Sequence, residues 1–522
     1  MPATTTIAPT GNAYIDGVLS GTKWAVTTLT FSFPSSASYY GSSYGSGEPL
    51  SNFEALNSVQ MAAARAVLAN YAAVANITFQ EITETATQHG DLRLAESDKP
   101  GTAWAYYPST AAEGGDAWFN NTTGYYDNPV IGTYAYSAFL HELGHSLGLK
   151  HPQDVSGSFG AMPLDKDSLE YSVMSYRSYI GASTSSGYTN AYGSYPQSLM
   201  MYDIAAVQKM YGADFSTNSG NTTYTWSSTT GEMSINGVGQ GTPAVNKIFL
   251  TIWDGGGTDT YDFSNYTTGV TVDLRPGQWS TASAAQLALL KYDGSEVAAG
   301  NIANALLYNG DLRSLIENAI GGKASDVLIG NVANNLLNGG AGNDRLIGDA
   351  GNDTLQGGAD SDTAVFSGSR SQYQVSQLAD GSLSVVDLRS GSPDGSDIVW
   401  NVEQFEFSDK KYTIAEVLAD PGSPPPQSST TGLTLTGTSG NDTLNGASLD
   451  DIISGLGGAD VLSGYGGADT LDGGSGSDKL YGGDGSWNRY RELRNGDGGG
   501  GCQSRIPLEQ QGGRLSRFIY RH

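Results

Sequence analysis

The sequence predicts a multidomain protein. An α/β domain, with a mixed twisted sheet and a long helix, precedes all-β domains of the parallel β-helix (β-roll) type. Three observations support this fold class. The chain has 522 residues, more than one domain of roughly 100 to 200 residues. Strand-like and helical patterns alternate up to about residue 214. Beyond residue 320, glycine-rich segments recur with a nine-residue period, which is typical of a parallel β-helix.

Local patterns predict the elements of the first domain. Residues 29–33 alternate between apolar and polar like a half-buried strand, and residues 58–71 carry apolar residues at helical spacing, with Ser58 as N-cap. A second helix is expected at 198–211 and ends at Gly212. Further elements are strands at 77–81, 91–95 and 117–120 and a helix at 134–147.

The nine-residue period occurs in two blocks. The first block has repeats starting at Gly321, Gly330, Gly339, Gly348 and Gly357, and the second at Gly437, Gly446, Gly455, Gly464, Gly473 and Gly482. Residues 371–418 lack the period, and a proline-rich linker follows. The expected organisation is an N-terminal segment (1–20), the α/β domain (21–214), a junction with the first roll (215–370), a β-rich module (371–420), a linker (421–436), the second repeat block (437–486) and an irregular basic tail (487–522).

Composition excludes several classes of function. The 53 acidic and 26 basic side chains give a net charge of −27, which repels nucleic acids and anionic membranes. Because Cys502 is the single cysteine, no intrachain disulfide can form. No apolar run of about 18 residues is present, so we expect no membrane insertion. Residues 1–21 lack the basic start and apolar run of a cleaved signal peptide.

One segment carries a complete metal-binding pattern. It reads His-Glu-Leu-Gly-His-Ser-Leu-Gly-Leu-Lys-His, from His141 to His151. Two histidines four residues apart lie on one helical face, where they can share a tetrahedral zinc ion. Gly148 can end the helix and return the chain so that His151 becomes the third ligand. Glu142 is then placed to act as general base toward a zinc-activated water.

This segment resembles the signature of the metzincin proteases, and the residues after it resemble the serralysin branch. Ser172-Val-Met-Ser-Tyr176 is similar to the methionine turn of that family. The resemblance implies that Met174 packs beneath the zinc and that Tyr176 contacts the resting metal and later stabilises the oxyanion. Residues 115–120 resemble the strand at the rim of the cleft, which implies substrate binding by Ala117, Trp118 and Phe119.

The repeats predict calcium binding. In each nonapeptide a six-residue turn exposes carbonyl groups and an aspartate, which are hard oxygen ligands suited to calcium, and a three-residue strand follows. The aspartates are Asp326, Asp344, Asp353 and Asp362 in the first block and Asp442, Asp451, Asp460, Asp469 and Asp478 in the second. Asn335 takes the equivalent place in the second repeat, where we expect weaker coordination or none. By resemblance to the serralysin junction, Asp254, Asp259 and Glu317 would join further calcium sites.

These features lead to one functional hypothesis and one rival. The expected protein is a secreted zinc metalloendopeptidase with calcium-stabilised repeats, which acts on protein or peptide substrates as a monomer. The family is exported by a type I machinery, so an extracellular location or retention at the bacterial cell surface is implied. The rival is a calcium-binding surface or adhesion protein with an inactive metzincin domain. In a third scheme, the repeats present an active protease on a surface.

The tail from Trp487 differs from the rest of the chain. It holds seven arginines and the single cysteine, and the repeat period fails at its start. We interpret this tail as the product of a frameshift or sequencing error.

Overall fold

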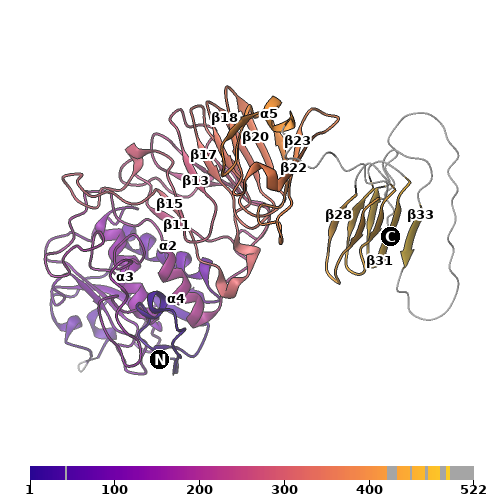
Figure 1. Ribbon diagram of the computed structural model, residues 1–522. Helices are drawn as coiled ribbons and strands as arrows, with labels where there is room; N and C mark the ends of the chain where they lie inside the picture. Colours follow the sequence, from indigo (N-terminus) through magenta and orange to yellow (C-terminus); the bar gives the residue numbers. More distant parts are fainter. Residues whose placement is uncertain (42–43, 420–431, 447–449, 465–467, 482–488, 494–522) are drawn as a thin grey trace, which may run out of the picture. The chain divides into compact units, whose positions relative to one another are not determined.

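The computed structural model describes residues 1–41, 44–419, 432–446, 450–464, 468–481 and 489–493 (Figure 1). The chain divides into two compact units, Met1–Ser423 and Pro424–His522. Most of the expected linker and most of the basic tail lie outside the described residues. The described part of the tail is the strand β33 (Arg489–Leu493), which pairs with β31 (Thr470–Ser475).

A five-stranded sheet forms one layer of the N-terminal domain, in the order β4-β3-β5-β7-β6. Its strands are β3 (Thr28–Ser32), β4 (Thr78–Glu81), β5 (Leu92–Ser97), β6 (Ala103–Ala105) and β7 (Ala117–Asn120). All neighbours pair in parallel except β6, which runs antiparallel to β7. The predicted mixed sheet is therefore present. Strands β1 (Thr4–Thr6) and β2 (Thr22–Trp24) form a separate antiparallel pair.

The helices of this domain are α1 (Ala13–Asp16), α2 (Ser58–Val74), α3 (Tyr134–Leu147) and α4 (Met201–Tyr211). The expected N-cap at Ser58 is wrong. Asn57 caps α2: its side chain accepts hydrogen bonds from the N–H groups of Val59 and Gln60, and Gln60 Oε1 accepts one from Asn57 N–H. Among the described residues, none of the helices is both long and apolar enough for a transmembrane span.

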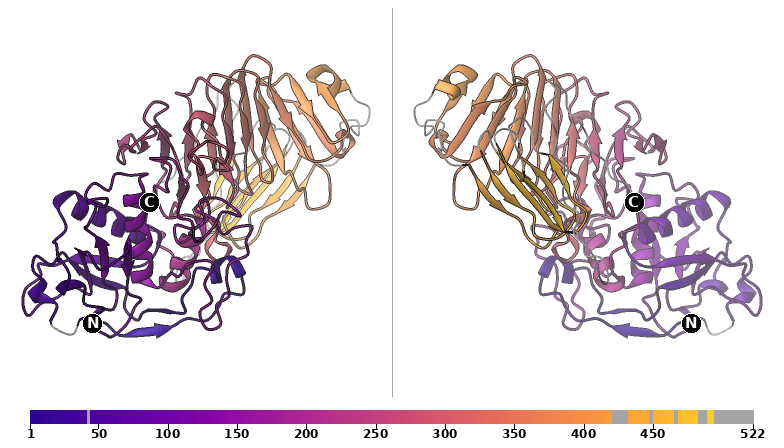
Figure 2. Two further views of the ribbon diagram at one scale, coloured as in Figure 1. Left: turned by 90° about the vertical axis from the view of Figure 1, so that its left-hand side faces the viewer. Right: turned by 90° about the vertical axis from the view of Figure 1, so that its right-hand side faces the viewer.

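The first roll stacks short parallel strands into sheets (Figure 2). A ten-stranded sheet has the order β10-β9-β8-β12-β16-β18-β20-β24-β23-β22, a six-stranded sheet the order β13-β17-β19-β21-β25-β26, and a small sheet the order β11-β15-β14. One leucine per repeat points inward and is fully buried, as Leu337, Leu346 and Leu355 show. The elements are β8 (Thr223–Trp226), β9 (Met233–Ile235), β10 (Val238–Gly239), β11 (Leu250–Ile252), β12 (Thr260–Asp262), β13 (Thr271–Asp273), β14 (Trp279–Ser280), β15 (Ile302–Asn304), β16 (Asn318–Ile320), β17 (Val327–Ile329), β18 (Leu336–Ala341), β19 (Arg345–Ile347), β20 (Thr354–Ala359), β21 (Thr363–Val365), β22 (Tyr373–Gln377), β23 (Leu383–Asp387), β24 (Ser396–Trp400), β25 (Gln404–Glu406), β26 (Lys411–Thr413) and helix α5 (Ile414–Ala419).

Residues 371–420 do not form a module apart from the roll. Strand β24 pairs in parallel with β20, and β25 pairs in parallel with β21. The hairpin β22–β23 extends the ten-stranded sheet antiparallel to β24. The sequence period is lost here, but the strand stacking continues.

The N-terminal domain and the start of the roll share a hydrophobic core. Phe249 and Trp253, from the junction, belong to the same buried cluster as Leu140 of α3. In addition, Ala191 N–H donates to Leu289 O at 2.9 Å, and residues 189 and 292 are joined through their backbones. A boundary near residue 214 therefore separates two sequence patterns but not two independent cores.

The second unit repeats the roll on a smaller scale. Its two sheets have the orders β27-β29-β31-β33 and β28-β30-β32, and the paired strands are parallel. Ile453, Leu462 and Leu471 form its buried core. The remaining strands are β27 (Thr434–Thr436), β28 (Thr443–Asn445), β29 (Ile452–Ser454), β30 (Val461–Ser463) and β32 (Lys479–Tyr481).

Candidate metal centre and calcium turns

Helix α3 positions the first two histidines and the glutamate. Thr133 caps the helix by accepting a hydrogen bond from Tyr136 N–H, and Gly148 ends it with φ of 115° in the left-handed region. A side chain at Gly148 is also excluded sterically, because a Cβ there would lie 2.3 Å from Thr22 O. The turn at this glycine redirects the chain toward His151, as the spacing predicts.

The backbone after Gly148 is held by the N-terminal segment. Ser20 N–H donates to Gly148 O, and Lys150 N–H donates to Val18 O. The Lys150 ammonium group is buried and donates to backbone carbonyls of the surrounding loops, including Asp154 O at 2.7 Å and Gly160 O at 3.1 Å. These bonds fix the loop that carries the third histidine.

The three histidine rings meet at one point. His145 Nε2 lies 3.0 Å from His151 Nε2, which in turn lies 3.2 Å from His141 Nε2. Within the described residues, these three form the one group of histidine, cysteine, aspartate or glutamate side chains assembled as a metal site.

The hydrogen bonds of the three Nδ1 atoms determine that the Nε2 atoms face the point where the rings meet. His141 Nδ1 lies 2.9 Å from Val173 O, His145 Nδ1 lies 2.8 Å from Leu149 O, and His151 Nδ1 lies 2.9 Å from Asp154 Oδ2. Because these partners accept hydrogen bonds, each Nδ1 carries the proton and each Nε2 keeps a lone pair. Three converging lone pairs repel one another unless a cation lies between them. The residues therefore fit a zinc ion.

Burial keeps these rings neutral. It lowers the pKa of His141 to about 3, with a further contribution from His151, and it lowers the pKa of His145 and of His151 as well. Zinc binds the neutral imidazole, so at neutral pH no proton has to be displaced from these ligands.

Glu142 faces a cavity beside the histidines. Its carboxylate oxygen Oε2 is buried without a hydrogen-bond partner among the described residues, and burial raises the pKa of Glu142 to about 8. The cavity has a volume of about 400 Å³ and is lined by His141, Glu142 and several tyrosines. The tyrosines are Tyr125, Tyr134, Tyr176, Tyr188 and Tyr195. An unpaired carboxylate on such a cavity is free to exchange a proton with a bound molecule.

The predicted methionine turn lies under the histidines. Met174 is fully buried, and a Cβ at Gly144 of α3 would lie 2.6 Å from Met174 Sδ. Asp203, at the start of α4, accepts hydrogen bonds from Ser172 Oγ at 2.6 Å and Val173 N–H at 2.7 Å. Because Val173 O also accepts from His141, Asp203 fixes the segment that orients the first ligand.

Tyr176 is next to the metal cluster. Its ring centroid lies 4.2 Å from that of His151 and 5.7 Å from that of His141. The side chain is 38% exposed, and partial burial raises the pKa of Tyr176 to about 12, so its hydroxyl is protonated at neutral pH. The structure thus places a hydrogen-bond donor beside the ligands.

The open edge of the sheet is β6, one strand away from the predicted rim on β7. Ala117, Trp118 and Phe119 lie on β7, between β5 and β6, and their side chains are fully buried. The backbone of β7 is therefore already paired on both sides. Strand β6 is the edge of the sheet, and Thr102 and Ala103 at its start line the cavity beside Glu142.

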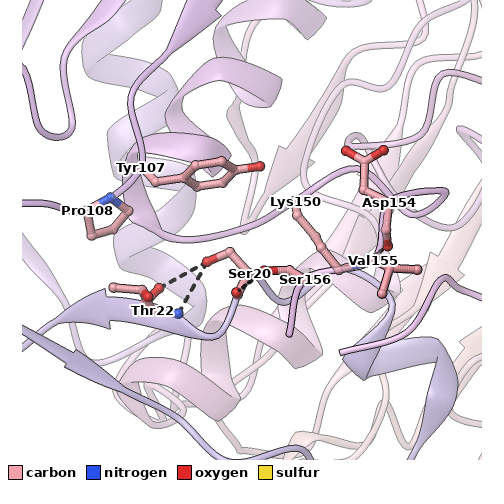
Figure 3. A pocket seen from close by; sticks show the side chains of 8 residues that line it. All are labelled: Ser20, Thr22, Tyr107, Pro108, Lys150, Asp154, Val155 and Ser156. Atoms are coloured by element: carbon pink, nitrogen blue, oxygen red, sulfur yellow. Dashed lines mark hydrogen bonds between the residues drawn. The ribbon is translucent and has the colours of Figure 1, made fainter. Parts of the chain in front are cut away.

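A second cavity has a volume of about 460 Å³ (Figure 3). Three chain segments line it: Ser20 and Thr22, Tyr107 and Pro108, and Lys150 with residues 154–156. The Tyr107 ring stands edge-on to His145, with centroids 5.4 Å apart. Asp154 lines this cavity and also accepts the hydrogen bond of His151 Nδ1, so it connects the cavity with this histidine.

The predicted calcium ligands of the first roll form two columns. In one column Asp326 N–H donates to Asp344 Oδ1, and Asp344 N–H donates to Asp362 Oδ1, both at 2.8 Å. The other oxygens, Oδ2 of Asp344, Asp353 and Asp362, are buried without partners in the described part of the chain. Buried carboxylate oxygens without donors fit hard cations such as calcium.

At the junction, Asp254 and Asp259 of the loop between β11 and β12 are neighbours of Glu317, which precedes β16. Asp259 N–H donates to Glu317 Oε2 at 2.7 Å, while Asp254 accepts from Tyr224 Oη at 2.7 Å. Burial and the neighbouring Asp254 raise the pKa of Asp259 to about 8. The expected role of these three residues in further calcium sites stays a prediction.

Asn335 places a side-chain amide in its turn, where the other repeats have an aspartate. Its Nδ2 donates to Glu317 O at 2.8 Å, and the neighbouring Asn331 Nδ2 donates to Leu274 O and Ile316 O. The amide groups thus place hydrogen-bond donors, rather than carboxylate oxygens, in this turn. The expectation of weak or absent calcium binding in this turn therefore has a structural basis.

In the second unit, Asp442, Asp451, Asp460, Asp469 and Asp478 repeat the arrangement. Asp442 N–H donates to Asp460 Oδ1 and Asp460 N–H donates to Asp478 Oδ1, at 2.8 and 3.0 Å. The five residues thus lie at equivalent places in successive turns.

Three family models match the chain. "Matrixin" matches residues 23–161, "Peptidase M10 serralysin C terminal" matches 213–412, and "RTX calcium-binding nonapeptide repeat" matches 434–462 and 454–486. Metallopeptidase AprA of Pseudomonas marginalis is 35% identical over 312 residues, which is 58% of this chain and 59% of that protein. Serralysin C of Dickeya chrysanthemi is also 35% identical over 312 residues, 58% of each chain. The matched part thus spans a little over half the length of these relatives.

The α/β domain is similar to the matrixin family, and its three-histidine cluster fits a zinc ion. A serralysin C-terminal region and calcium-binding nonapeptide repeats follow it in the same chain. The chain is therefore serralysin-like, with zinc and calcium as its metals, and the predicted fold class is confirmed.

Proposed function

We propose that this chain is a secreted zinc endopeptidase that hydrolyses peptide bonds of extended protein segments. The observation that carries the proposal is the convergence of three histidine Nε2 atoms beside the unpaired Glu142 carboxylate on one cavity. The rival, a calcium-binding adhesion protein with an inert domain, gives no reason for a complete ligand set and a buried base.

Each residue has a role in this proposal. His141, His145 and His151 would hold the zinc, and Met174 supports their positions from below. When bound, zinc supplies a Lewis acid that lowers the pKa of a water molecule and polarises a carbonyl group. Glu142 would act as the general base, accepting the proton of the attacking water as the water oxygen forms a bond to the peptide carbon. Glu142 then gives the proton to the amide nitrogen as the carbon–nitrogen bond breaks.

Two further features serve the same reaction. The Tyr176 hydroxyl, protonated and next to His151, is placed to donate a hydrogen bond to the oxyanion. The edge strand β6 offers unpaired backbone groups to which an extended peptide can add as another strand. The tyrosine-lined cavity next to Glu142 then receives one substrate side chain.

The calcium-binding repeats are the reason for proposing an extracellular location. Calcium is abundant outside cells and would fold the repeats after export. We infer export by a type I machinery and a monomeric enzyme, in keeping with the repeat class. Comparing cells with their medium by immunoblot tests the location.

The central experiment compares Glu142→Gln with the parent chain and with Glu113→Gln, a carboxylate outside the cleft. The parent and Glu113→Gln should cleave unfolded casein and lose activity with a zinc chelator. Glu142→Gln should keep its zinc, because Glu142 is no ligand, but lose at least about 10²-fold in kcat. Casein left intact by the zinc-loaded parent chain would contradict the proposed function.

A further inference from the structure

An arm of the first roll packs into the core of the α/β domain. The arm comprises residues 287–299, just before β15, and it folds back on itself, since Ala298 N–H donates to Ala288 O at 3.0 Å. Its buried residues Ala288, Leu290 and Ala298 belong to the same hydrophobic cluster as Met174. The roll therefore contributes side chains to the core that contains the methionine turn.

Glu170 connects the arm with the segment that leads into the methionine turn. This residue is 6% exposed, and its Oε1 accepts a hydrogen bond from Ala299 N–H at 2.9 Å. The other carboxylate oxygen, Oε2, accepts one from Ser168 Oγ at 3.2 Å. Because a buried carboxylate needs such donors, these bonds hold the arm against the chain four residues before Met174.

The methionine turn lies in a loop that is closed at its base. Leu169 N–H donates to Arg177 O at 2.9 Å, so the residues between them move as one unit. Within this loop, Val173 O accepts the hydrogen bond of His141 Nδ1 at 2.9 Å. A shift of Glu170, at the start of the loop, would therefore be passed on to the first histidine.

The arm also holds one wall of the tyrosine-lined cavity. Tyr188 lines this cavity, and its Oη donates to Ser175 O of the methionine turn at 2.8 Å. The next residue, Thr189, binds the arm twice: its Oγ1 donates to Leu290 O at 2.8 Å, and its O accepts from Tyr292 N–H at 2.8 Å. The arm is thus bonded to the cavity wall as well as to the methionine loop.

We propose that the arm positions the peptidase site, with Glu170 and Thr189 as the positioning residues. This inference rests on the proposed function. Neither residue lines the cavity, so Glu170 acts through the methionine loop and Thr189 acts through Tyr188. Loss of the Glu170 contact should lower kcat, because it displaces groups that act on the transition state. Loss of the Thr189 contact should raise KM, because it loosens a wall that receives a substrate side chain.

The test uses the full chain loaded with zinc and calcium, and a fluorogenic peptide made from a casein sequence that the parent chain cleaves. Glu170→Ala should lower kcat about tenfold, since small displacements of reacting groups cost up to about 10²-fold in rate. Glu170→Gln should recover most of the parental kcat, because its amide oxygen can still accept from Ala299 N–H. Glu296→Ala removes an exposed carboxylate from the arm itself and should keep the parental kcat and KM.

Thr189→Val tests the second contact with a side chain of the same shape. It removes the hydroxyl and should raise KM several-fold with little change in kcat. Parental kcat and KM in a folded Glu170→Ala chain would overturn the proposal, as would an equal loss of kcat in Glu170→Gln. If Glu170→Ala does not fold, Thr189→Val decides, and parental kinetics in that variant would overturn it.

Zinc competition against a chelator adds a readout that needs no cleavage. Glu170→Ala should raise the zinc dissociation constant several-fold, since the loop that it releases orients His141. If the parent chain cleaves no peptide, the proposed function fails, and an unchanged zinc dissociation constant in Glu170→Ala would then reject the positioning role separately.

Discussion

Asp154→Ala should weaken zinc binding about tenfold. The carboxylate of Asp154 accepts the His151 Nδ1 hydrogen at 2.9 Å and so keeps the lone pair of Nε2 directed at the metal. Loss of such an outer partner lowers metal affinity by roughly 10- to 100-fold. Because the side chains of Asp154 and His151 are 49% and 18% exposed, solvent screens the interaction, and we expect the lower limit. A tenfold change equals about 1.4 kcal/mol.

The assay is zinc competition against a chromophoric chelator, with unfolding curves to verify the fold. Asp154→Asn should lose less than Asp154→Ala, because the amide oxygen can still accept the hydrogen bond. Asp165→Ala is the matched control, since that exposed carboxylate binds Tyr14 Oη and no zinc ligand. An unchanged zinc dissociation constant in Asp154→Ala would show that this hydrogen bond does not orient His151.

Three other predictions address the remaining features. Tyr176→Phe should keep fold and zinc but lower kcat more than it raises KM, since its hydroxyl acts on the transition state; an effect on KM alone would assign Tyr176 to substrate binding. Asn335→Ala should leave the number of bound calcium ions unchanged but lower the free energy of unfolding by about 1–3 kcal/mol, because a buried carbonyl loses its donor; denaturant titration measures this, and a lost calcium ion would refute it. Calcium removal should unfold residues 321–366 and 437–485 while the α/β domain keeps much of its secondary structure; circular dichroism that does not change between calcium-free and millimolar-calcium buffer would contradict it.

We expect calcium removal to leave the α/β domain folded because the repeats and this domain have different hydrophobic clusters. The inward leucines of the first roll belong to one buried cluster, whereas α3 and the histidine loop belong to another. Loss of calcium leaves the aspartate columns without a counter-charge, but it does not remove the apolar contacts of the α/β domain.

The sequence alone determined the features that depend on short spacings. His141 and His145 share a helical face because they are four residues apart, and Gly148 brings His151 back within the next turn. The nine-residue period likewise determined the roll and the aspartate columns, since each repeat is one turn and one strand. These predictions needed no knowledge of distant contacts.

The tertiary structure decided what distant segments do to one another. Asp203 supports the methionine turn from 30 residues away, and Asp397 meets Asp353 across 44 residues. The edge position belongs to β6 rather than β7 because pairing order, not strand sequence, determines which backbone is left open. Such contacts depend on the path of the whole chain, which a local pattern of residues does not determine.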